Sequence, residues 1–465
     1  MIRKALLILS GNAAASLLLL ARNLMVARLI PVEDYGVAAT FAMVMAMVEM
    51  ASAFGLQQQI VQAQEGDDPH FQAALQGFQL FRGVIAGMVL FALAGPLARF
   101  LGIPEIAGAY QILALVPVFN ALQHFDIHRL NRQMRFGPLL LTGTVPAVVA
   151  LVLVWPLVIW LGDWQVMLWS IMAQTIVSVL VSHLLAERPY RLAWDRGIIT
   201  NSLNFGWPLL INSMLMFLVF QGDKLIVGRV MGMEALAIFA MGMTLTLTPT
   251  LVLATSAQNL FLPRLSAEAR TPRFAASANI CLQGIAFSSV IFALAVMLAS
   301  GAAIELLLGD KYAPLAPLLI WFALCQALRL MKAGPAIIAL ALGHTGNAMI
   351  ANLVRVAGLP LAWVTAERGG TIMDILLIGL AAEALGLVVA IWLMLGRARL
   401  PRRHIILQQA GVVGMILAMG FLAHLTPDNA LLAPFSVWLG AAAILALSIL
   451  LLPGIRQVLQ RKKIE

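Results

Sequence analysis

The chain has 465 residues, of which 62% are hydrophobic and only 11% are charged. A soluble domain is usually about half apolar and about a quarter charged, so this chain has too few charges to cover a water-facing surface. The net charge of +9 would suit nucleic acid, but the basic residues cluster between apolar segments, a pattern of membrane orientation that excludes a nucleic-acid partner.

Apolar segments long enough to cross a bilayer, about 20 residues each, recur along the whole chain. The sequence predicts an all-α membrane protein with about fourteen transmembrane helices, over residues 6–30, 36–62, 78–101, 108–128, 138–161, 164–186, 203–229, 235–262, 278–308, 314–342, 345–366, 373–396, 404–425 and 430–453. The first apolar stretch runs on to Ile30 without a convincing cleavage site, so it is predicted to be a membrane helix rather than a signal peptide.

Basic residues are distributed unevenly between the two sides that the predicted loops define. Nineteen of the 30 lysines and arginines lie in loops on the side of the N-terminus or in the C-terminal tail. The opposite loops carry three, Arg99, Lys311 and Arg368. Because cytoplasmic loops are enriched in lysine and arginine, both termini are predicted to be cytoplasmic.

Residues 22–39 and 223–240 resemble each other at a constant offset of 201, with five identities in eighteen positions. Each copy crosses the junction between an odd-numbered predicted helix and the next one, and six helices separate the copies. This even separation preserves orientation, so we predict two six-helix lobes related as parallel repeats about an axis along the membrane normal. The predicted domains are an N-terminal lobe over 1–195, a C-terminal lobe over 196–400, and two extra helices with a basic cytoplasmic tail over 401–465.

Several charges fall inside the predicted spans, where each carries an energetic cost and calls for an explanation. The basic ones are Arg22, Arg28, Arg82, Lys224, Arg229, Arg329, Lys332 and Arg355, and the acidic ones are Glu49, Asp223 and Glu383. Arg28 and Arg229 end their helices and can extend to the membrane interface. The six remaining cations outnumber the three acids.

One interpretation is that the surplus cations line a wet cavity and bind an anion. Arginine suits phosphate through its bidentate fork, and lysine contributes a point charge. The predicted substrate cavity consists of Arg22, Asn23, Arg82, Asp223, Lys224, Arg329, Lys332 and Arg355.

The alternative interpretation is a set of buried ion pairs. Under it, Arg22 pairs with Glu49, and Lys224 pairs with Asp223. The two acids, Glu49 and Asp223, are also candidates for a coupling proton, and the sequence does not decide between these roles.

Motifs for enzymatic chemistry are absent from the sequence. The chain has neither G-x-x-x-x-G-K-[ST] nor H-E-x-x-H, the motifs of phosphate-binding loops and of one class of zinc site. Its two cysteines, Cys281 and Cys325, lie inside apolar runs, which disfavours a disulfide framework or a metal site. We therefore predict a carrier without catalytic residues, cofactor or metal.

Three segments carry a resemblance to a known family. The first is ARLIPVEDYGVAA at the first helix junction, the second is NRQMRFGPL after the fourth helix, and the third is GDKLIVGRVMGMEALAIFAM at the seventh and eighth helices. In the third, Ala237 stands where a glycine is typical, and Ile238 and Phe239 stand where a tyrosine is typical. With the predicted spans and twin lobes, these segments make the chain resemble the polysaccharide transporter branch of the multidrug/oligosaccharidyl-lipid/polysaccharide flippase superfamily.

The resemblance implies a flippase that moves undecaprenyl-diphosphate-linked oligosaccharide across the bacterial inner membrane. The substrate would serve synthesis of O-antigen, capsule or exopolysaccharide, and the two lobes would work by alternating access. The implied partners are the lipid-linked oligosaccharide, membrane lipids, and a polysaccharide polymerase and glycosyltransferases, with the carrier itself a monomer.

Two alternatives from the same superfamily stay open. A lipid II flippase shares a basic lumen and fourteen helices, and the sequence pattern separates it only weakly. A cation-coupled multidrug antiporter has twelve helices and usually a carboxylate in the first, whereas the first acid here, Glu33, follows that helix. A membrane glycosyltransferase or polymerase is disfavoured by the short loops.

Overall fold

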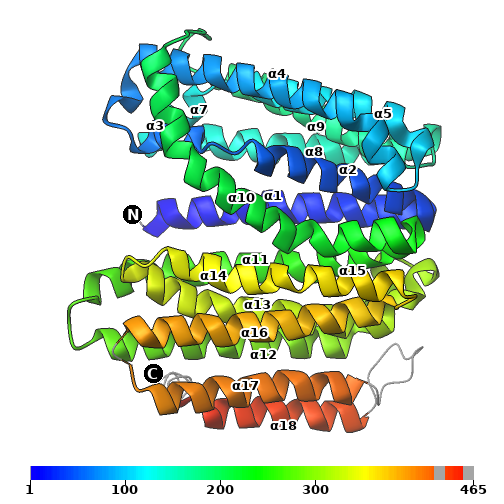
Figure 1. Cartoon of the computed structure of the whole chain (residues 1–465), viewed down its shortest axis with the longest axis vertical. Helices are drawn as coiled ribbons and strands as arrows, with labels where there is room; N and C mark the ends of the chain where they lie inside the picture. The colour runs from blue at the N-terminus through cyan, green and yellow to red at the C-terminus, as the bar shows by residue number, and fades with distance from the viewer. Residues whose placement is uncertain (1, 399, 424–434, 454–465) are drawn as a thin grey trace. The chain divides into compact units, whose positions relative to one another are not determined.

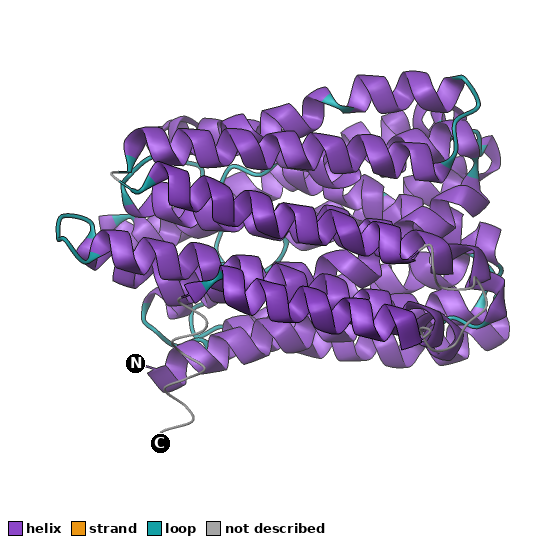
Figure 2. Cartoon of the chain, turned by 90° about the horizontal axis from the view of Figure 1, so that it is seen from below, coloured by secondary structure: helices purple, strands orange, loops and turns teal. Residues whose placement is uncertain are grey.

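The structure, a computed structural model, describes the backbone of residues 2–398, 400–423 and 435–453, and the side chains of these residues except 2–13, 435 and 436. Within these ranges the chain is helical and contains no strand (Figure 2). The all-helical class predicted from the composition is therefore confirmed. Arg399 and the basic residues of the C-terminal tail, which entered the topology prediction, lie outside the described residues.

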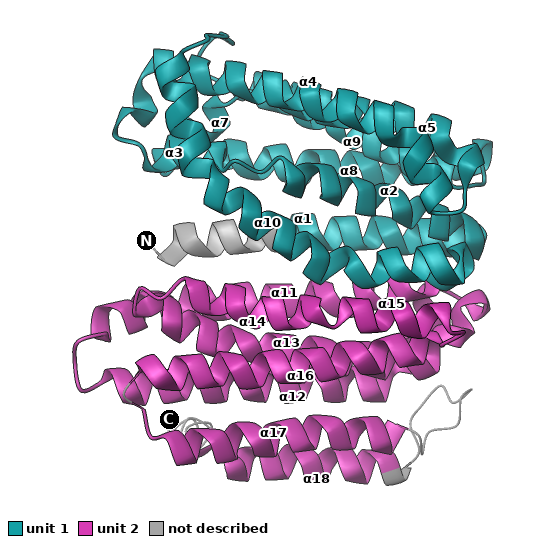
Figure 3. Ribbon diagram, in the orientation of Figure 1, with its two compact units in different colours: residues 1–237 teal, residues 238–465 magenta. Residues whose placement is uncertain are grey.

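The chain divides into two compact units, residues 1–237 and 238–465 (Figure 3). Unit 1 contains α1 (Ile2–Leu29), α2 (Val32–Ala51), α3 (Leu56–Gln62), η1 (Gln64–Asp67), α4 (Pro69–Phe100), η2 (Pro104–Ile106), α5 (Ala107–Leu113), α6 (Leu115–Ala121), α7 (Asp126–Arg132), α8 (Gly137–Trp160), α9 (Gln165–Leu184) and α10 (Arg196–Met231). The long helix α11 (Met233–Glu268) begins in unit 1 and continues in unit 2. Unit 2 then contains α12 (Phe274–Leu307), η3 (Asp310–Leu315), α13 (Ala316–Ala341), α14 (Gly346–Ala357), α15 (Leu359–Glu367), α16 (Ile372–Arg397), α17 (Arg402–Ala423) and α18 (Phe435–Leu451).

Within unit 1, α8 packs against α1 and α9, α4 packs against α5 and α6, and α10 packs against α2 and α4 (Figure 1). Both copies of the sequence repeat cross a short helix break, between α1 and α2 and between α10 and α11. The two copies also touch, because a Cβ at Gly36 would lie 1.9 Å from the carbonyl oxygen of Met233. Only glycine allows that approach. The predicted domain limits at 195 and 400 stay a prediction.

Three of the predicted spans are broken rather than continuous. The span over 36–62 divides into α2 and α3, with Gly55 in the left-handed region at a φ of 66°. The span over 108–128 divides into α5, α6 and α7, and its two parts, Pro104–Ala121 and Asp126–Arg132, are bent by 49°. The span over 345–366 divides at Gly358, shortly before Pro360, which lacks the amide hydrogen that a continuous helix would use.

Counted by length and apolarity, the membrane spans of the described residues are fewer than the fourteen predicted. Among the described residues, eleven helices are long and apolar enough to cross a membrane, or twelve if the bent pair counts as one span. Helix α18 adds only a shorter apolar segment, Val437–Leu451. The count of fourteen is thus not confirmed, although the multi-pass character is.

Unit 2 has a continuous apolar core in which α12 and α13 pack against each other and α16 packs against α13. The pair α17 and α18 packs on the α12 side of this core. In both units, large apolar side chains also remain exposed, with Trp160 at 82% and Trp392 at 71%. A surface of this kind suits a lipid environment, in which apolar side chains need no cover.

Candidate functional site

Unit 1 contains a polar cavity of about 810 Å³ whose lining belongs entirely to that unit. Its walls come from α2, α3, α4, α6, α7, α8, α9 and α10 and from the ends of these helices. The lining is rich in amide and hydroxyl side chains, namely Ser52, Gln57, Gln58, Gln79, Asn120, Gln123, Thr142, Gln174, Thr175, Ser178, Asn212 and Ser213. Glu49 and Arg82 add one carboxylate and one guanidinium, so the formal charges of these two groups cancel.

Hydrogen bonds hold several of the lining amides in place. Gln123 Nε2 donates to Ser178 Oγ over 2.9 Å, and Ser178 Oγ donates to the carbonyl of Thr142 over 3.2 Å. Gln174 Oε1 accepts a hydrogen bond of 2.7 Å from Arg22. Because an amide has both a carbonyl oxygen and an NH₂ group, these bonds leave the oxygen of Gln123 and the NH₂ group of Gln174 available to a ligand.

Arg82 of α4 supports the break between α2 and α3 at the cavity wall. A helix that ends leaves its last carbonyls without partners inside the helix. Arg82 Nη1 donates to the carbonyl of Ser52, and Ser52 Oγ donates to the carbonyl of Val48 over 2.7 Å. Glu49, in the last turn of α2, is exposed and lines the cavity. The break therefore places the carboxylate of Glu49 and the guanidinium of Arg82 at the same part of the cavity wall.

The other predicted residues of unit 1 lie outside the cavity lining. Arg22 is buried, with 7% of its surface exposed, and it donates to Gln174 and, over 3.4 Å, to Asn23 Oδ1. The described hydrogen bonds of Arg22 are thus to amide groups, and the ion pair with Glu49 that the alternative interpretation offered is not among its described contacts. Asp223 and Lys224 lie on α10, and neither is part of the lining.

Unit 2 gathers three predicted cations around one buried carboxylate, and we call Arg329, Lys332, Arg355 and Glu383 the Glu383 cluster. Glu383 Oε1 accepts from Arg329 Nη2 over 2.7 Å and lies 3.3 Å from Arg355 Nε. Lys332 Nζ lies 2.6 Å from Glu383 Oε2. The side chain of Glu383 is 1% exposed, and those of the three cations are between 4% and 14% exposed.

Three helices build the Glu383 cluster, and two glycines of α16 lie against its cations. Arg329 and Lys332 come from α13, Arg355 comes from α14, and Glu383 comes from α16. On α16, the spacing of Gly379, Glu383 and Gly386 places all three on one face. A Cβ at position 379 would lie 3.5 Å from Arg355 Nη2, and a Cβ at position 386 would lie 3.6 Å from Lys332 Nζ.

The formal charge of the Glu383 cluster is +2, because three cations accompany one carboxylate. Removing charges from water costs several kcal/mol per ion, and the attraction between partners offsets this cost only when the geometry is good. Lys332 adds a contact of 3.4 Å to Asn352 Oδ1, and Arg329 adds one of 3.3 Å to Gln326 Oε1. The cluster is thus a network of short polar contacts that carries a net positive charge between α13, α14 and α16.

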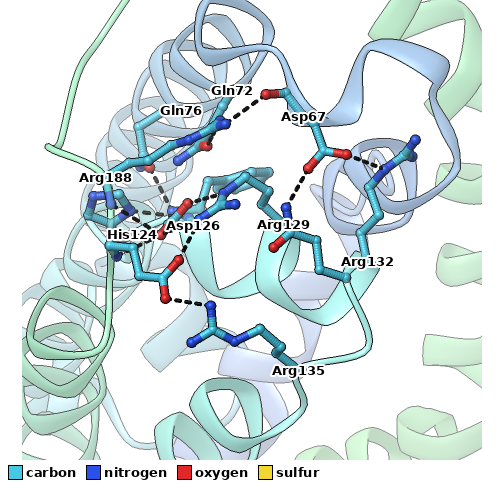
Figure 4. A network of polar contacts seen from close by, with 12 residues as sticks. Asp67, Gln72, Gln76, His124, Asp126, Arg129, Arg132, Arg135 and Arg188 are labelled. Carbon is cyan, nitrogen blue, oxygen red and sulfur yellow. Dashed lines mark hydrogen bonds and ion pairs between the residues drawn. The ribbon is translucent and has the colours of Figure 1, made fainter.

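A third polar assembly joins α7 to the segment after α9 (Figure 4). Asp126 is fully buried and accepts from Arg129 Nε over 2.5 Å and from the backbone N–H of Glu187 over 2.8 Å. Arg129 and Arg135 both reach the carboxylate of Glu187. The Arg135 guanidinium, assisted by Arg129, holds the pKa of Glu187 below its usual value.

The same assembly extends to the turn before α4 (Figure 4). Arg132 lies 3.3 Å from Asp67 Oδ2 and donates to the carbonyl of Val61 over 2.8 Å. Hydrogen bonds from Gln133 and Arg132 hold the pKa of Asp67 below its usual value. The basic segment NRQMRFGPL therefore connects α7 to α3 and to the turn at Asp67.

The structure brings some of the predicted site residues together and separates others. Arg329, Lys332 and Arg355 meet at Glu383, and Arg82 shares a cavity with Glu49. Sequence reasoning missed the amide lining, because glutamine and asparagine are uncharged and do not stand out in an apolar run. The consecutive glutamines of LQQQIVQ in α3 were a usable signal, since an apolar span has no need of them.

A model of a family described as "Polysaccharide biosynthesis protein" matches residues 25–317. The amylovoran biosynthesis protein AmsL of Erwinia amylovora is 23% identical over 308 residues, which cover 63% of this chain and 78% of that protein. The succinoglycan biosynthesis transport protein ExoT of Rhizobium meliloti (strain 1021) is 23% identical over 245 residues, which cover 51% of this chain and 48% of that protein.

Solved structures show the same fold at low sequence identity. The lipid II flippase MurJ in an inward closed conformation has a TM-score of 0.73 and 15% identity, with 99% of this chain and 100% of that chain covered. An inward-facing multidrug resistance MATE family transporter of the MOP superfamily has a TM-score of 0.63 and 15% identity, with 87% of this chain and 95% of that chain covered. A MATE family transporter in an outward-facing conformation has a TM-score of 0.53 and 16% identity, with 85% and 94% covered.

Proposed function

The chain belongs to the polysaccharide biosynthesis protein family, in the polysaccharide transporter branch of the flippase superfamily, and on that premise we propose that it flips an undecaprenyl-diphosphate-linked oligosaccharide across the bacterial cytoplasmic membrane. The oligosaccharide would be a precursor of O-antigen, capsule or exopolysaccharide. Glycosyltransferases would build it on the lipid, and a polysaccharide polymerase would consume it after translocation.

The observation that carries this proposal is the polar cavity of unit 1. Helices that include several long apolar spans surround about 810 Å³ with amides, hydroxyls, one carboxylate and one guanidinium. Polar groups at membrane depth are costly unless they face water or a polar ligand. A hydrophilic headgroup that must cross an apolar layer is such a ligand.

The diphosphate is the charged part of the proposed substrate, and the deep cations are its proposed partners. Arg82 lines the cavity, while Arg22 lies behind it on Gln174. In unit 2, the Glu383 cluster has a formal charge of +2 and contains two guanidinium groups and one ammonium group. These are groups that suit phosphate oxygens. We propose that these groups hold the diphosphate in turn during an alternating-access cycle, in which both lobes take part.

The proposed orientation has both termini in the cytoplasm, as the distribution of basic loops indicates. Reporter fusions after residues 135, 196, 273 and 403 should all report the cytoplasmic side. A periplasmic signal at any two of these positions would contradict the orientation. Size-exclusion chromatography in detergent would check the proposed monomer.

The transport proposal is tested with purified protein in proteoliposomes that contain fluorescent undecaprenyl-diphosphate oligosaccharide. We expect the protein to expose the label to a membrane-impermeant quencher faster than protein-free liposomes do. Arg82→Gln should slow this step, whereas Arg402→Gln, at the exposed start of α17, should leave it unchanged. Movement of lipid II or efflux of cationic drugs instead of the oligosaccharide would favour the two alternatives from the same superfamily.

A further inference from the structure

We propose that the unit 1 cavity is the subsite for the neutral, hydroxyl-rich glycan of the substrate, and that its glutamine and asparagine side chains select that glycan. The inference rests on the proposed function and deepens it, because it assigns sugar recognition to the amide wall of the cavity and leaves the diphosphate to the deep cations, of which Arg82 alone lines the cavity.

The first argument is the charge of the lining. Glu49 and Arg82 contribute opposite charges to the cavity, and the remaining polar lining is neutral apart from His128. A site for a diphosphate needs a surplus of cations, as in the Glu383 cluster. The described lining of the cavity has no such surplus, so its chemistry fits a neutral polar ligand better than an anion.

The second argument is the type of polar group. Each sugar hydroxyl is both a donor and an acceptor, and each primary amide offers two donors and an acceptor. Gln57 and Gln58 begin α3, Asn212 comes from α10, and all three are exposed and line the cavity. None of the three is hydrogen-bonded to another described residue, so their amide groups remain available to a ligand.

The third argument is the fixed part of the wall. Gln123 is held by Ser178, and Gln174 is held by Arg22. Such contacts orient an amide before a ligand arrives, which reduces the entropy that binding would otherwise cost. The cavity therefore combines oriented amides on one part of its wall with adaptable amides on α3 and α10.

The fourth argument concerns size and strength of binding. A volume of about 810 Å³ lies within the range of small-molecule pockets, about 300–1,000 Å³, and fits a short glycan. The described lining contains no tryptophan, tyrosine or phenylalanine on which a sugar ring would stack. Binding by hydrogen bonds alone stays moderate, as a carrier requires if it is to release the glycan.

The experiment compares Gln57→Met/Gln58→Met with Gln62→Met. Methionine has nearly the shape of glutamine but makes no amide hydrogen bond, and Gln62 is an exposed residue of the same helix that does not line the cavity. In proteoliposomes, the double variant should flip the full lipid-linked oligosaccharide about tenfold more slowly, the effect of losing two neutral hydrogen bonds. It should flip undecaprenyl-diphosphate monosaccharide within about twofold of the wild-type rate, because that probe carries the same diphosphate. The Gln62→Met variant should match the wild type with both probes.

Equal slowing of both probes, or unchanged flipping of the oligosaccharide, would overturn the glycan subsite. A second measurement separates this inference from the proposed function. The free oligosaccharide, released from its lipid by mild acid, should raise the melting temperature of the wild type and of Gln62→Met in detergent, but not that of the double variant. Failure of the wild type to flip any lipid would count against the proposed function alone, whereas failure of the free glycan to stabilise the wild type would refute the subsite even if flipping occurs.

Discussion

The cavity of unit 1 and the Glu383 cluster of unit 2 place polar side chains inside apolar helices in opposite ways. The cavity keeps mainly neutral amides and hydroxyls in contact with open space, and Glu49 is exposed there. The cluster packs three cations against one carboxylate, and the side chain of Glu383 is 1% exposed. In the cavity a polar group keeps access to solvent or ligand, whereas in the cluster it depends on its protein partners.

This difference separates two kinds of intramembrane charge that look alike in a sequence. Glu49 and Glu383 are both single acids within apolar runs, yet one faces a cavity and the other is enclosed by arginine and lysine. The stability of the fold should therefore depend strongly on Glu383 and little on Glu49.

Glu383→Gln should have the largest effect, because it removes the only carboxylate among the described members of the cluster and leaves three cations together. Breaking a buried ion pair from one side costs about 3–5 kcal/mol. We expect a markedly lower melting temperature in detergent and a lower yield of folded protein. Glu305→Gln, an exposed acid of α12, is the matched control, and adding Lys332→Met to Glu383→Gln should recover part of the loss. A melting temperature equal to that of the control would contradict the interpretation.

Gly386→Ala should have the next largest effect. Its Cβ would lie 3.0 Å from the carbonyl oxygen of Ala351, so the backbone of α14 would have to give way by a few tenths of an ångström. Overpacking of this kind costs about 1–3 kcal/mol, and the helix gain of up to about 1 kcal/mol on replacing glycine with alanine offsets part of this cost. Gly396→Ala, on the same helix with nothing within 4 Å of its Cβ, should be neutral or stabilising by up to about 1 kcal/mol. Thermal unfolding of the two variants side by side decides the point, and equal values would show that the cluster tolerates expansion.

The assembly around Glu187 and Asp67 should respond to pH with a smaller effect, because both carboxylates are exposed. Their pKa values are lower in the folded protein, so their contribution to stability is present above the ordinary carboxyl pKa of about 4. It is lost as the pH falls through the lowered values. The difference in melting temperature between wild type and Arg135→Gln should be constant between about pH 7 and 5 and shrink below about pH 4. A difference that persists at low pH would exclude this ionic origin.

Glu49→Gln should have the smallest effect on stability, within about 0.5 kcal/mol, as for a surface substitution. The substitution changes a group that faces open space, and the ion pair with Arg22 that the alternative interpretation offered is not among its described contacts. Thermal unfolding measures the stability, and flipping assays with and without a proton gradient show whether Glu49 has a coupling role. A destabilisation comparable to that of Glu383→Gln would contradict the view that the fold depends on Glu383 but not on Glu49.

Composition and the length of the apolar segments determined the helical membrane class, because a chain with 11% charged residues cannot cover a water-facing surface and apolar runs of about 20 residues suit spanning helices. The repeat at 22–39 and 223–240 also marked two corresponding helix junctions. Both copies cross a helix break in the structure, between α1 and α2 and between α10 and α11. Gln326, Arg329 and Lys332 are spaced by three residues, which places them on one side of α13. These are local properties, and a sequence records them directly.

Only the tertiary structure decided which polar groups meet. Glu383 lies 54 residues from Arg329 in the chain, and nothing in its neighbourhood indicates that three cations would converge on it. The sequence offered Glu49 as one candidate partner of Arg22. In the structure Arg22 instead donates a hydrogen bond to Gln174, which lies 152 residues away. The helix breaks that open the cavity likewise depend on supports from other helices, as Arg82 provides at Ser52. Pairing and cavities arise from contacts between distant segments, and apolar composition, the strongest signal in this sequence, carries no information about them.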